Sequence, residues 1–296
     1  MSNKYLRRAR MAKNDEFYTL YEDIEKEVLH YKDKFRNKTV YCNCDNPNKS
    51  NFIKFFLRNF RLLGIKRLIS TGYNKGGRGY ILDTMNPDEV EIKELDGDGD
   101  FSSDECLELL GQADIVCTNP PFSLLRRYIG ILANHNKEFL IIGNINALVC
   151  KGVDSLVVDG RIRLGYTRPK KFETASREIV DIGCACWITT FEVNRSKLEL
   201  VATYSPDRYV KYSNYPYAIN VNRIRDIPCD YFGEIGVPLT FLFHHNAEQF
   251  MLVNTDDDVL HQYNQYKVNN RHVFEIMGKN MYRRFVIRRN VQKIRR

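Results

Sequence analysis

Apolar runs of strand length recur along the first two thirds of the chain, and stretches with helical spacing separate them. The predicted strands are Thr39–Cys44, Arg67–Thr71, Asp114–Thr118 and Glu138–Gly143, with Gly79–Leu82 and Glu91–Leu95 as a hairpin or a decorated third strand. The predicted helices are the stretch marked by Leu20, Ile24, Val28 and Tyr31, then Ser50–Leu63, Cys106–Leu110 and Leu124–Leu132. Strands that alternate with helices predict an α/β fold with a mostly parallel sheet covered on both faces.

The pattern changes after about residue 200, where tyrosines and prolines become frequent and short elements joined by loops are expected. The sequence therefore predicts three parts: a basic arm at 1–13, an α/β domain at 14–200 and a further region at 201–296. The arm is either a solubilising tail or a contact for phosphates. The same two interpretations apply to the basic segment Arg283–Arg296.

Composition adds modest limits to this picture. The 296 residues are 43% hydrophobic and 28% charged, with a net charge of +8, which weakly favours a polyanionic partner. No run approaches 18 apolar residues, and the start lacks the apolar core of a signal peptide, so neither a membrane span nor secretion is expected. We expect the cytoplasm, with free thiols.

Two C-x-C pairs, Cys42/Cys44 and Cys184/Cys186, raise the question of a metal site. Zinc sites usually combine two pairs with two to four residues between the cysteines. Both pairs here lie in apolar runs, where alternation places the two sulfurs on one face of a strand. The sequence favours buried thiols and no metal.

The strongest chemical signal is Ala113–Phe122, in which a buried strand runs into Asn119-Pro120-Pro121-Phe122. In an open α/β sheet, ligands bind beyond the carboxyl ends of the strands. An exocyclic amine on adenine is a poor nucleophile because its lone pair is delocalised into the ring. The Asn119 side-chain oxygen and the Pro120 carbonyl can hold its two hydrogens, with the turn fixed by the prolines and Phe122 stacking on an extruded base. The alternative is a plain turn with a hydrophobic anchor.

Asn14–Ile24 (NDEFYTLYEDI) is ambiguous by itself. On this segment alone we favour a capped helix, with Thr19 near its N-terminus and Phe17 as a hydrophobic staple. The functional alternative places Tyr18 and Thr19 at the methionine end of a cofactor.

Two further segments fit a nucleotide-like cofactor. In Val40–Phe52, Asp45 can accept the cofactor α-amino group, and the helix after it can favour the carboxylate. The alternative there is an Asx-type turn at Asp45-Asn46-Pro47. In Glu94–Ser103, the Asp-Gly run does not match the ligand spacing of a calcium loop, so Asp100 and Phe101 are better placed to hold an adenine ring.

In this order the segments resemble the EcoRI-type family of adenine-specific DNA methyltransferases. The resemblance rests on NDEFYT, YCNCDNP, SNF, GDF, TNPPF and FLIIGNINA, and extends to residues 219–242. It implies a Rossmann-like methyltransferase fold, S-adenosylmethionine as cofactor, and duplex DNA with a flipped adenine as substrate. The resemblance assigns catalysis to Asn119, Pro120, Pro121 and Phe122, and cofactor binding to Phe17, Tyr18, Thr19, Asp45, Asn46, Pro47, Asp100 and Phe101.

By the same resemblance, 201–296 is a DNA target-recognition region packed on a catalytic domain. The resemblance implies a monomeric enzyme. It also allows for a separate cognate restriction endonuclease that acts on the same DNA site. One departure is that the strand Arg67–Thr71 ends without the acidic residue that usually holds the ribose, for which Tyr73 or Asn74 is a substitute. Trp187 is either a second wall around the flipped base or a buried strand residue. His244 and His245 match no role.

Two rival functions are also compatible with the sequence. Asn-Pro-Pro-aromatic motifs also occur in amino-methyltransferases that act on RNA or on protein glutamine. The other rival is a catalytically silent DNA-binding homologue, against which the intact Asn119–Phe122 motif argues.

Overall fold

The computed structural model describes residues 17–174, 176–264 and 273–290. The predicted arm 1–13, the first three residues of NDEFYT and the last part of the basic tail, 291–296, lie outside these ranges. The chain divides into two compact units, one formed by residues up to Ala147 with Ile162–Val193, the other by Leu148–Arg161 with Asn194 onward.

The first unit is built on an eight-stranded sheet. In sheet order its strands are β5 (Ile92–Glu94), β4 (Tyr80–Thr84), β3 (Arg67–Gly72), β2 (Thr39–Cys42), β6 (Ile115–Thr118), β7 (Glu138–Asn144), β11 (Ala185–Thr189) and β8 (Arg163–Leu164). Strands β3, β2, β6 and β7 are parallel. The other neighbours are antiparallel: β4 on β3, β5 on β4, β11 on β7 and β8 on β11.

The sheet is therefore mixed, and the prediction of a mostly parallel sheet was wrong. The parallel centre was correctly inferred, because its strands are buried on both faces and read as continuous apolar runs. The antiparallel edges have a local cause on one side, where a short connection joins β3, β4 and β5 as a meander. At the opposite edge of the sheet, a long segment of the chain separates β7 from β11, and β11 pairs antiparallel with β7.

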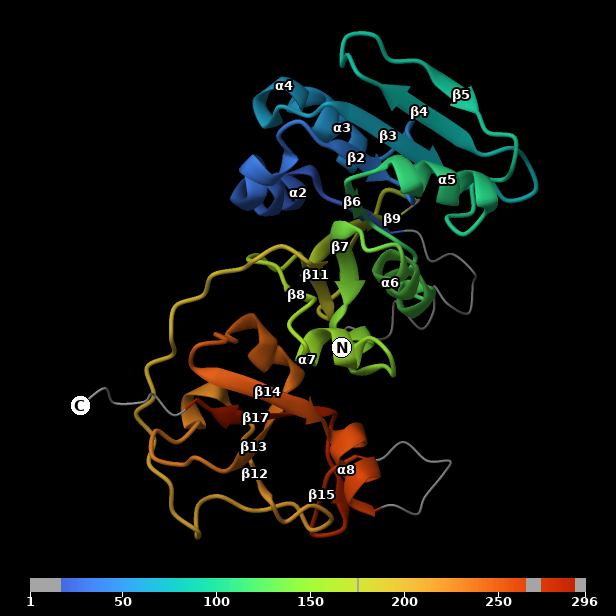
Figure 1. Ribbon diagram of the computed structural model, residues 1–296. Helices are drawn as coiled ribbons and strands as arrows, with labels where there is room; N and C mark the ends of the chain where they lie inside the picture. The colour runs from blue at the N-terminus through green and yellow to red at the C-terminus, as the bar shows by residue number, and fades with distance from the viewer. Residues whose placement is uncertain (1–16, 175, 265–272, 291–296) are drawn as a thin grey trace. The chain divides into compact units, whose positions relative to one another are not determined.

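Helices cover both faces of this sheet (Figure 1). Helices α2 (Tyr21–Val28), α3 (Asn51–Arg58) and α4 (Phe60–Leu63) lie on one face, followed in the case of α2 by the 3₁₀ segment η1 (Leu29–Phe35). Helices α5 (Asp104–Gln112) and α6 (Leu125–Asn134) lie on the other face. The helix predicted over Ser50–Leu63 is interrupted at Asn59, and Gly64 ends it in the left-handed conformation, with φ of 64°.

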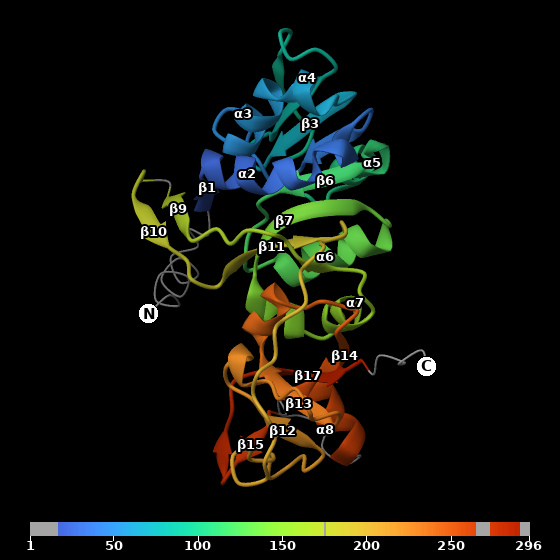
Figure 2. The ribbon, with the colours of Figure 1, turned by 90° about the vertical axis from the view of Figure 1, so that its left-hand side faces the viewer.

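A small antiparallel sheet lies beside the large one. It consists of β1 (Phe17–Thr19), β9 (Lys171–Thr174) and β10 (Ile179–Asp181), in the order β1-β9-β10 (Figure 2). The helix expected after this segment is present as α2, but Phe17–Thr19 form strand β1 in place of the cap and hydrophobic staple that we favoured. The following helix begins at Tyr21 with Leu20 as its N-cap, and no side chain caps it.

The second unit contains the four-stranded sheet β12-β13-β17-β14, made by β12 (Ala218–Asn220), β13 (Glu234–Pro238), β17 (Arg284–Arg289) and β14 (Phe250–Thr255). Helices α7 (Asp154–Val158) and α8 (Asp256–Asn264) pack on β14, and β15 (Glu275–Ile276) pairs with β16 (Lys279–Asn280). Short helical turns η3 (Ile224–Asp226) and η4 (Leu239–Phe243) also belong to this unit, whereas η2 (Ile145–Val149) begins in the first unit and ends in the second. The basic segment is thus partly a central strand, with Arg284–Ile287 buried.

All eight cysteines are free thiols, and Cys42, Cys184 and Cys186 are buried. Within the described residues, no group of three or more His, Cys, Asp or Glu side chains is arranged to hold a metal ion. The same residues include no helix long and apolar enough to cross a bilayer.

Candidate functional site

The candidate site lies where the order of the parallel strands reverses. From β2 the chain moves outward to β3, and it later returns on the other side of β2 with β6 and then β7. The carboxyl ends of β2 and β6 are therefore neighbours at a topological switch point, where open α/β sheets bind ligands. Asp45 follows β2 at this point, and Asn119 follows β6 directly.

Asp45 connects these two strand ends. Its Oδ1 accepts a hydrogen bond from the Ser50 hydroxyl at 2.5 Å, and its Oδ2 accepts one from the Thr118 hydroxyl and one from the main-chain N–H of Asn119 at 3.3 Å. The residue is only 7% exposed. Burial raises the pKa of the Asp45 carboxyl to about 6, against the lowering effect of these three hydrogen bonds. The Asx turn in this loop forms at Asn46, whose Oδ1 accepts from the N–H of Asn48 at 2.9 Å.

The Asn119 side chain is oriented by β1. Its amide nitrogen donates to the main-chain carbonyl of Phe17. A carbonyl can only accept, so the contact requires the NH₂ group on this side and directs the Asn119 oxygen the other way. Pro120 is buried, whereas Asn119, Pro121 and Phe122 are partly exposed. The Asn119 oxygen is therefore set as an acceptor beside a turn that two prolines stiffen.

An aromatic cluster stands next to this turn. The Phe122 ring lies 6.2 Å from the ring of Phe17 and 6.3 Å from that of Phe172, centroid to centroid. Phe172 belongs to β9, which pairs with β1 so that Phe172 faces Thr19. Sequence reasoning missed Phe172, because nothing near it in the chain marks a site and only the pairing of β9 with β1 brings it here.

Strand β1 separates the three residues predicted to hold the cofactor. Alternation puts Phe17 and Thr19 on one face, both buried, and Tyr18 on the other, partly exposed. Asn51 at the start of α3 donates to the Thr19 carbonyl at 2.9 Å, which brings Thr19 beside the Asp45 loop. The Thr19 hydroxyl is buried and has no hydrogen-bond partner among the described residues.

The loops after β3 and before α5 close around the same sheet edge. A Cβ built on Gly72 would lie 2.7 Å from Asn46 Cα, and one built on Gly99 would lie 2.6 Å from the Gly72 carbonyl oxygen. Gly99 also has φ of 80°. These close approaches pack the end of β3 at Gly72 between the Asp45-Asn46-Pro47 loop on one side and the GDF loop (Gly99-Asp100-Phe101) on the other, and only glycine permits them.

In the GDF loop, Asp100 is partly exposed, and its Oδ1 accepts from the N–H and hydroxyl of Ser102 at 2.8 and 2.5 Å. Phe101 is 5% exposed and meets the Tyr128 ring edge-on at 5.1 Å. Tyr128 also donates to the buried Asn43 side chain just after β2. Asp100 and Phe101 are thereby held against the strand end that carries Asp45.

These features fit a bound nucleotide-like cofactor. An unsatisfied buried hydroxyl at Thr19 is a polar group that a ligand can pair, since native structures rarely leave such groups unpaired. Because Gly72 and Gly99 have no side chains, main-chain atoms line these loops. Turns that bind phosphates or nucleosides expose their main chain to the ligand in the same way. The start of α3, capped by the Ser50 hydroxyl, adds the positive end of a helix of eight residues.

Several other sequence candidates lie elsewhere. Trp187 is fully buried in β11 with its ring 6.0 Å from that of Phe52, so it is a core residue of the sheet. Tyr73 is 51% exposed, and the Asn74 amide is used by its own loop, donating to the Arg78 carbonyl at 2.9 Å. His245 lies in the second unit, with its Nε2 2.9 Å from the Phe250 carbonyl.

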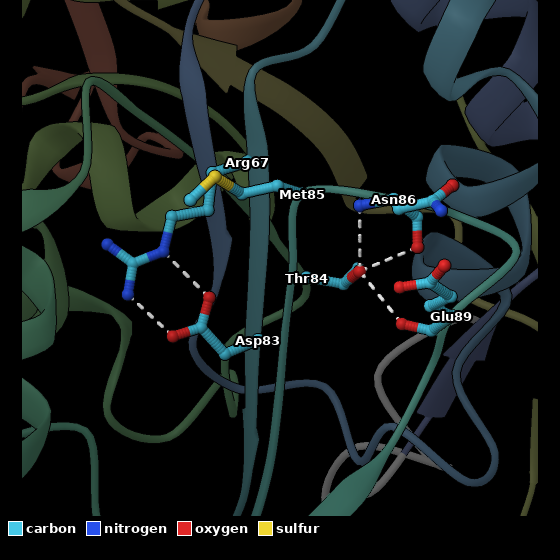
Figure 3. Close-up of a pocket in the computed structure, with 6 residues that line it drawn as sticks. All are labelled: Arg67, Asp83, Thr84, Met85, Asn86 and Glu89. Atoms are coloured by element: carbon cyan, nitrogen blue, oxygen red, sulfur yellow. Dashed lines mark hydrogen bonds and ion pairs between the residues drawn. The ribbon is translucent and has the colours of Figure 1, made fainter.

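A hollow in the surface of the first unit lies away from these residues (Figure 3). It is lined by Arg67, Asp83, Thr84, Met85, Asn86 and Glu89. Arg67 and Asp83 form a two-pronged ion pair of 2.7 and 2.5 Å, and the Thr84 hydroxyl bonds within its own turn. Arg67 begins β3, whereas the candidate site lies at the other end of that strand. The polar groups of this hollow therefore stabilise the pairing of β3 with β4 and the turn that follows β4.

Comparisons with known proteins match nearly the whole chain. A family described as adenine-specific methyltransferase EcoRI matches residues 5–293. The Type II methyltransferase M.EcoRI of Escherichia coli is 39% identical over 291 residues, covering 85% of this chain and 89% of that protein. M.MgeORF184P of Mycoplasma genitalium and M.MpnI of Mycoplasma pneumoniae, both named Type II methyltransferases, are each 35% identical, covering 96% of this chain and 98% of theirs. No solved structure matches the chain.

The match extends through nearly the whole length of the chain and includes the loops that carry Asp45, Asp100 and Asn119. The chain belongs to the EcoRI family of adenine-specific methyltransferases.

Proposed function

We propose that this chain is a site-specific DNA methyltransferase that transfers a methyl group from S-adenosylmethionine to N6 of an adenine flipped out of duplex DNA. The observation that carries the proposal is the orientation of Asn119. Its amide nitrogen is held by the Phe17 carbonyl, so its oxygen points away from that contact and can accept a hydrogen from the target amine.

The chain's residues act by holding the amine. Asn119 Oδ1 and the Pro120 carbonyl accept the two N6 hydrogens and turn the nitrogen lone pair towards the methyl group. S-adenosylmethionine supplies a methyl group on a positively charged sulfur: N6 forms the new bond to carbon, and the carbon–sulfur bond breaks with its electron pair left on sulfur. N6 then carries the positive charge and loses one proton to water. Phe122 gives the extruded base a flat apolar surface.

For the cofactor we propose the edge lined by Phe17, Tyr18, Thr19, Asn46, Pro47, Asp100 and Phe101. The buried Asp45, which the sequence grouped with them, supports this edge through its bonds to Ser50 and Thr118. The unpaired Thr19 hydroxyl and the start of α3 suit the methionine end. Asp100 suits the nucleoside end, because its Oδ2 has no hydrogen bond among the described residues while Oδ1 is fixed by Ser102. The parallel strands β3-β2-β6-β7, with helices on both faces, support a Rossmann-like catalytic domain at 14–200.

We assign DNA target recognition to 201–296. Exposed basic side chains in this part of the chain, Lys211, Arg223 and Arg225 among them, are suited to phosphate contacts. The proposal includes a monomer that works in the cytoplasm alongside a restriction endonuclease of the same specificity. The basic arm at 1–13 is proposed as a further phosphate contact.

The test offers purified protein three acceptors with tritiated-methyl S-adenosylmethionine: duplex DNA, structured RNA and a glutamine-containing peptide. We expect label in DNA alone, and single-molecule sequencing should place it on adenine N6 at one short sequence. Label in RNA or peptide instead would give the chain another substrate. Cofactor binding without any transfer would mark a silent homologue.

A further inference from the structure

The Asp45 carboxylate is buried, and neither of its oxygens has a positively charged partner among the residues that the structure describes. Its three hydrogen bonds come from two hydroxyls and one main-chain N–H. A carboxylate removed from water in this way is costly compared with an uncharged side chain of the same shape. A residue whose only task was to fill the space between β2 and β6 would not need the charge.

Both bonds to Oδ2 act on the catalytic turn. Thr118 is the last residue of β6 and Asn119 is the next residue, so one carboxylate oxygen holds two consecutive residues just before Pro120. The Thr118 hydroxyl in turn accepts from the main-chain N–H of Cys44 at 3.1 Å. The end of β6 is thus tied to the loop after β2 through a side chain and through the main chain.

Asn119 is consequently held at two points. Asp45 holds its main-chain nitrogen, and the Phe17 carbonyl holds its side-chain nitrogen. The first contact fixes the position of the Asn119 main chain, and the second fixes the orientation of its side-chain amide. The two acceptors proposed for the target amine both depend on the first contact, because Asn119 Oδ1 is on the side chain of the residue that is held and the Pro120 carbonyl is on the next residue.

We propose that Asp45 is a positioning residue for methyl transfer, which fixes the main chain at Asn119 so that the two acceptor oxygens keep the spacing that the N6 amine requires. This inference rests on the proposed function, and it gives Asp45 a task other than capture of the cofactor amino group. A carboxylate accepts about four hydrogen bonds. Three are made here, and only Oδ1 retains a free lone pair.

The test separates the transfer step from cofactor binding. In Asp45→Asn, the amide keeps the shape of the carboxylate but removes one acceptor and the charge. We expect the single-turnover rate at saturating cofactor and DNA to fall by about 10²-fold, as for a small misplacement of a catalytic group. The dissociation constant for S-adenosylmethionine, measured by calorimetry, should change by less than about threefold, since a change of that size is below a typical hydrogen-bond contribution.

A matched control lies at the opposite end of the same two strands. Asp114 stands before β6, and its Oδ2 accepts from the main-chain N–H of Thr39 at the start of β2 at 2.8 Å. Asp114→Asn therefore makes the same chemical change between β2 and β6, remote from the catalytic turn. We expect its single-turnover rate to match the wild type.

A second variant covers a failure of Asp45→Asn to fold. Thr118→Val removes one donor to Asp45 Oδ2 and keeps the side-chain shape, so it should lower the single-turnover rate by about tenfold, in the same direction. A cofactor dissociation constant raised tenfold with an unchanged rate at saturation would overturn the proposal and make Asp45 a cofactor ligand. Unchanged values for both quantities would also overturn it. Failure of the proposed function would show separately, as DNA methylation that persists in Asn119→Ala.

Discussion

The side-chain amide nitrogen of Asn119 donates a hydrogen bond to the main-chain carbonyl of Phe17, which stands 102 residues earlier in the chain. Phe17 lies in β1, a strand of three residues that precedes α2. The contact joins two motifs that appear separate in the sequence. The FYT segment therefore contributes to the catalytic turn through its backbone as well as to the proposed cofactor edge.

We expect Asn119→Ala to bind S-adenosylmethionine nearly as the wild type does and to lower the methylation rate by about 10²-fold or more, because one pre-positioned acceptor is lost. A tritiated-methyl assay measures the rate and calorimetry measures the binding. Asn134→Ala, at the exposed end of α6, serves as the control and should leave both unchanged. Near wild-type turnover in Asn119→Ala would remove the catalytic assignment.

The sequence predicted the parallel centre of the fold well, because its strands are short apolar runs with turn residues at their ends. The predicted Arg67–Thr71 strand is observed as Arg67–Gly72, and Asp114–Thr118 as Ile115–Thr118. Strand β1 was not predicted, because three residues carry no periodicity of their own and their partner, Lys171–Thr174, is far away in the sequence. A cap and a hydrophobic staple for the following helix were the better local interpretation of Phe17–Thr19, and pairing with β9 overrode it.

Asp100→Ala should weaken cofactor binding by roughly 1.5–3 kcal/mol, the cost of losing a hydrogen bond that involves a charge. Phe101→Ala should weaken it as well, because the ring fills the space between the loop and Tyr128. Calorimetric titration with S-adenosylmethionine measures both effects. Asp96→Ala is the matched control: its side chain is 98% exposed on the same loop and, within the described part of the chain, forms its ion pair with Arg78 at 2.8 Å. Equal dissociation constants in Asp100→Ala and Asp96→Ala would leave the GDF loop as a surface turn.

The candidate site was predictable in its residue types but not in its connections. Asp45, Asp100 and Asn119 follow strands or precede a helix in an order that the sequence displays. The burial of Asp45 and its bond to Asn119 were not visible, because they depend on the reversal of strand order that makes β2 and β6 neighbours. Likewise, Trp187 offered two interpretations until its position in β11 showed it to be fully buried.

Asp45 should give activity and stability opposite responses to pH. Burial raises its pKa from the ordinary 3.8 to about 6, so the native state binds more protons than the unfolded chain between these values. Its contribution to stability is present in full below about pH 3.8 and is lost as the pH rises through about 6. The positioning role requires the ionised form, so the single-turnover rate should instead fall about tenfold from pH 7 to pH 5.

Stopped-flow or quench methylation assays across this range, with parallel thermal unfolding, measure the two responses. Asp45→Asn should flatten both, because no proton is left to titrate at this position. A wild-type rate that declines with pH only where the protein also unfolds would mean that Asp45 has a purely structural task.

The last prediction concerns which basic side chains bind DNA. Arg288 and Arg289 belong to the basic segment Arg283–Arg296, for which the sequence allowed phosphate contacts, but Arg288 has another partner. It forms an ion pair of 2.5 Å with the buried Glu234, which also accepts from the Tyr215 hydroxyl at 2.8 Å. Removing Arg288 would leave Glu234 without its cation, so weaker DNA binding in that variant would be confounded with loss of stability.

Arg223 and Arg225 are better probes, since both are exposed and neither guanidinium pairs with a carboxylate among the described residues. Each phosphate contact adds about 0.9 to the slope of log affinity against log salt, so Arg223→Ala/Arg225→Ala should flatten that slope by up to about 2 and weaken binding to all duplexes alike. Arg58→Ala/Arg61→Ala removes the same charge from the first unit and should leave the slope unchanged, which separates a local contact from the effect of net charge. Fluorescence anisotropy titrated with salt measures the slope. If the two double variants flatten it equally, only the overall positive charge attracts DNA; if neither does, the phosphate contacts belong to other side chains than Arg223 and Arg225.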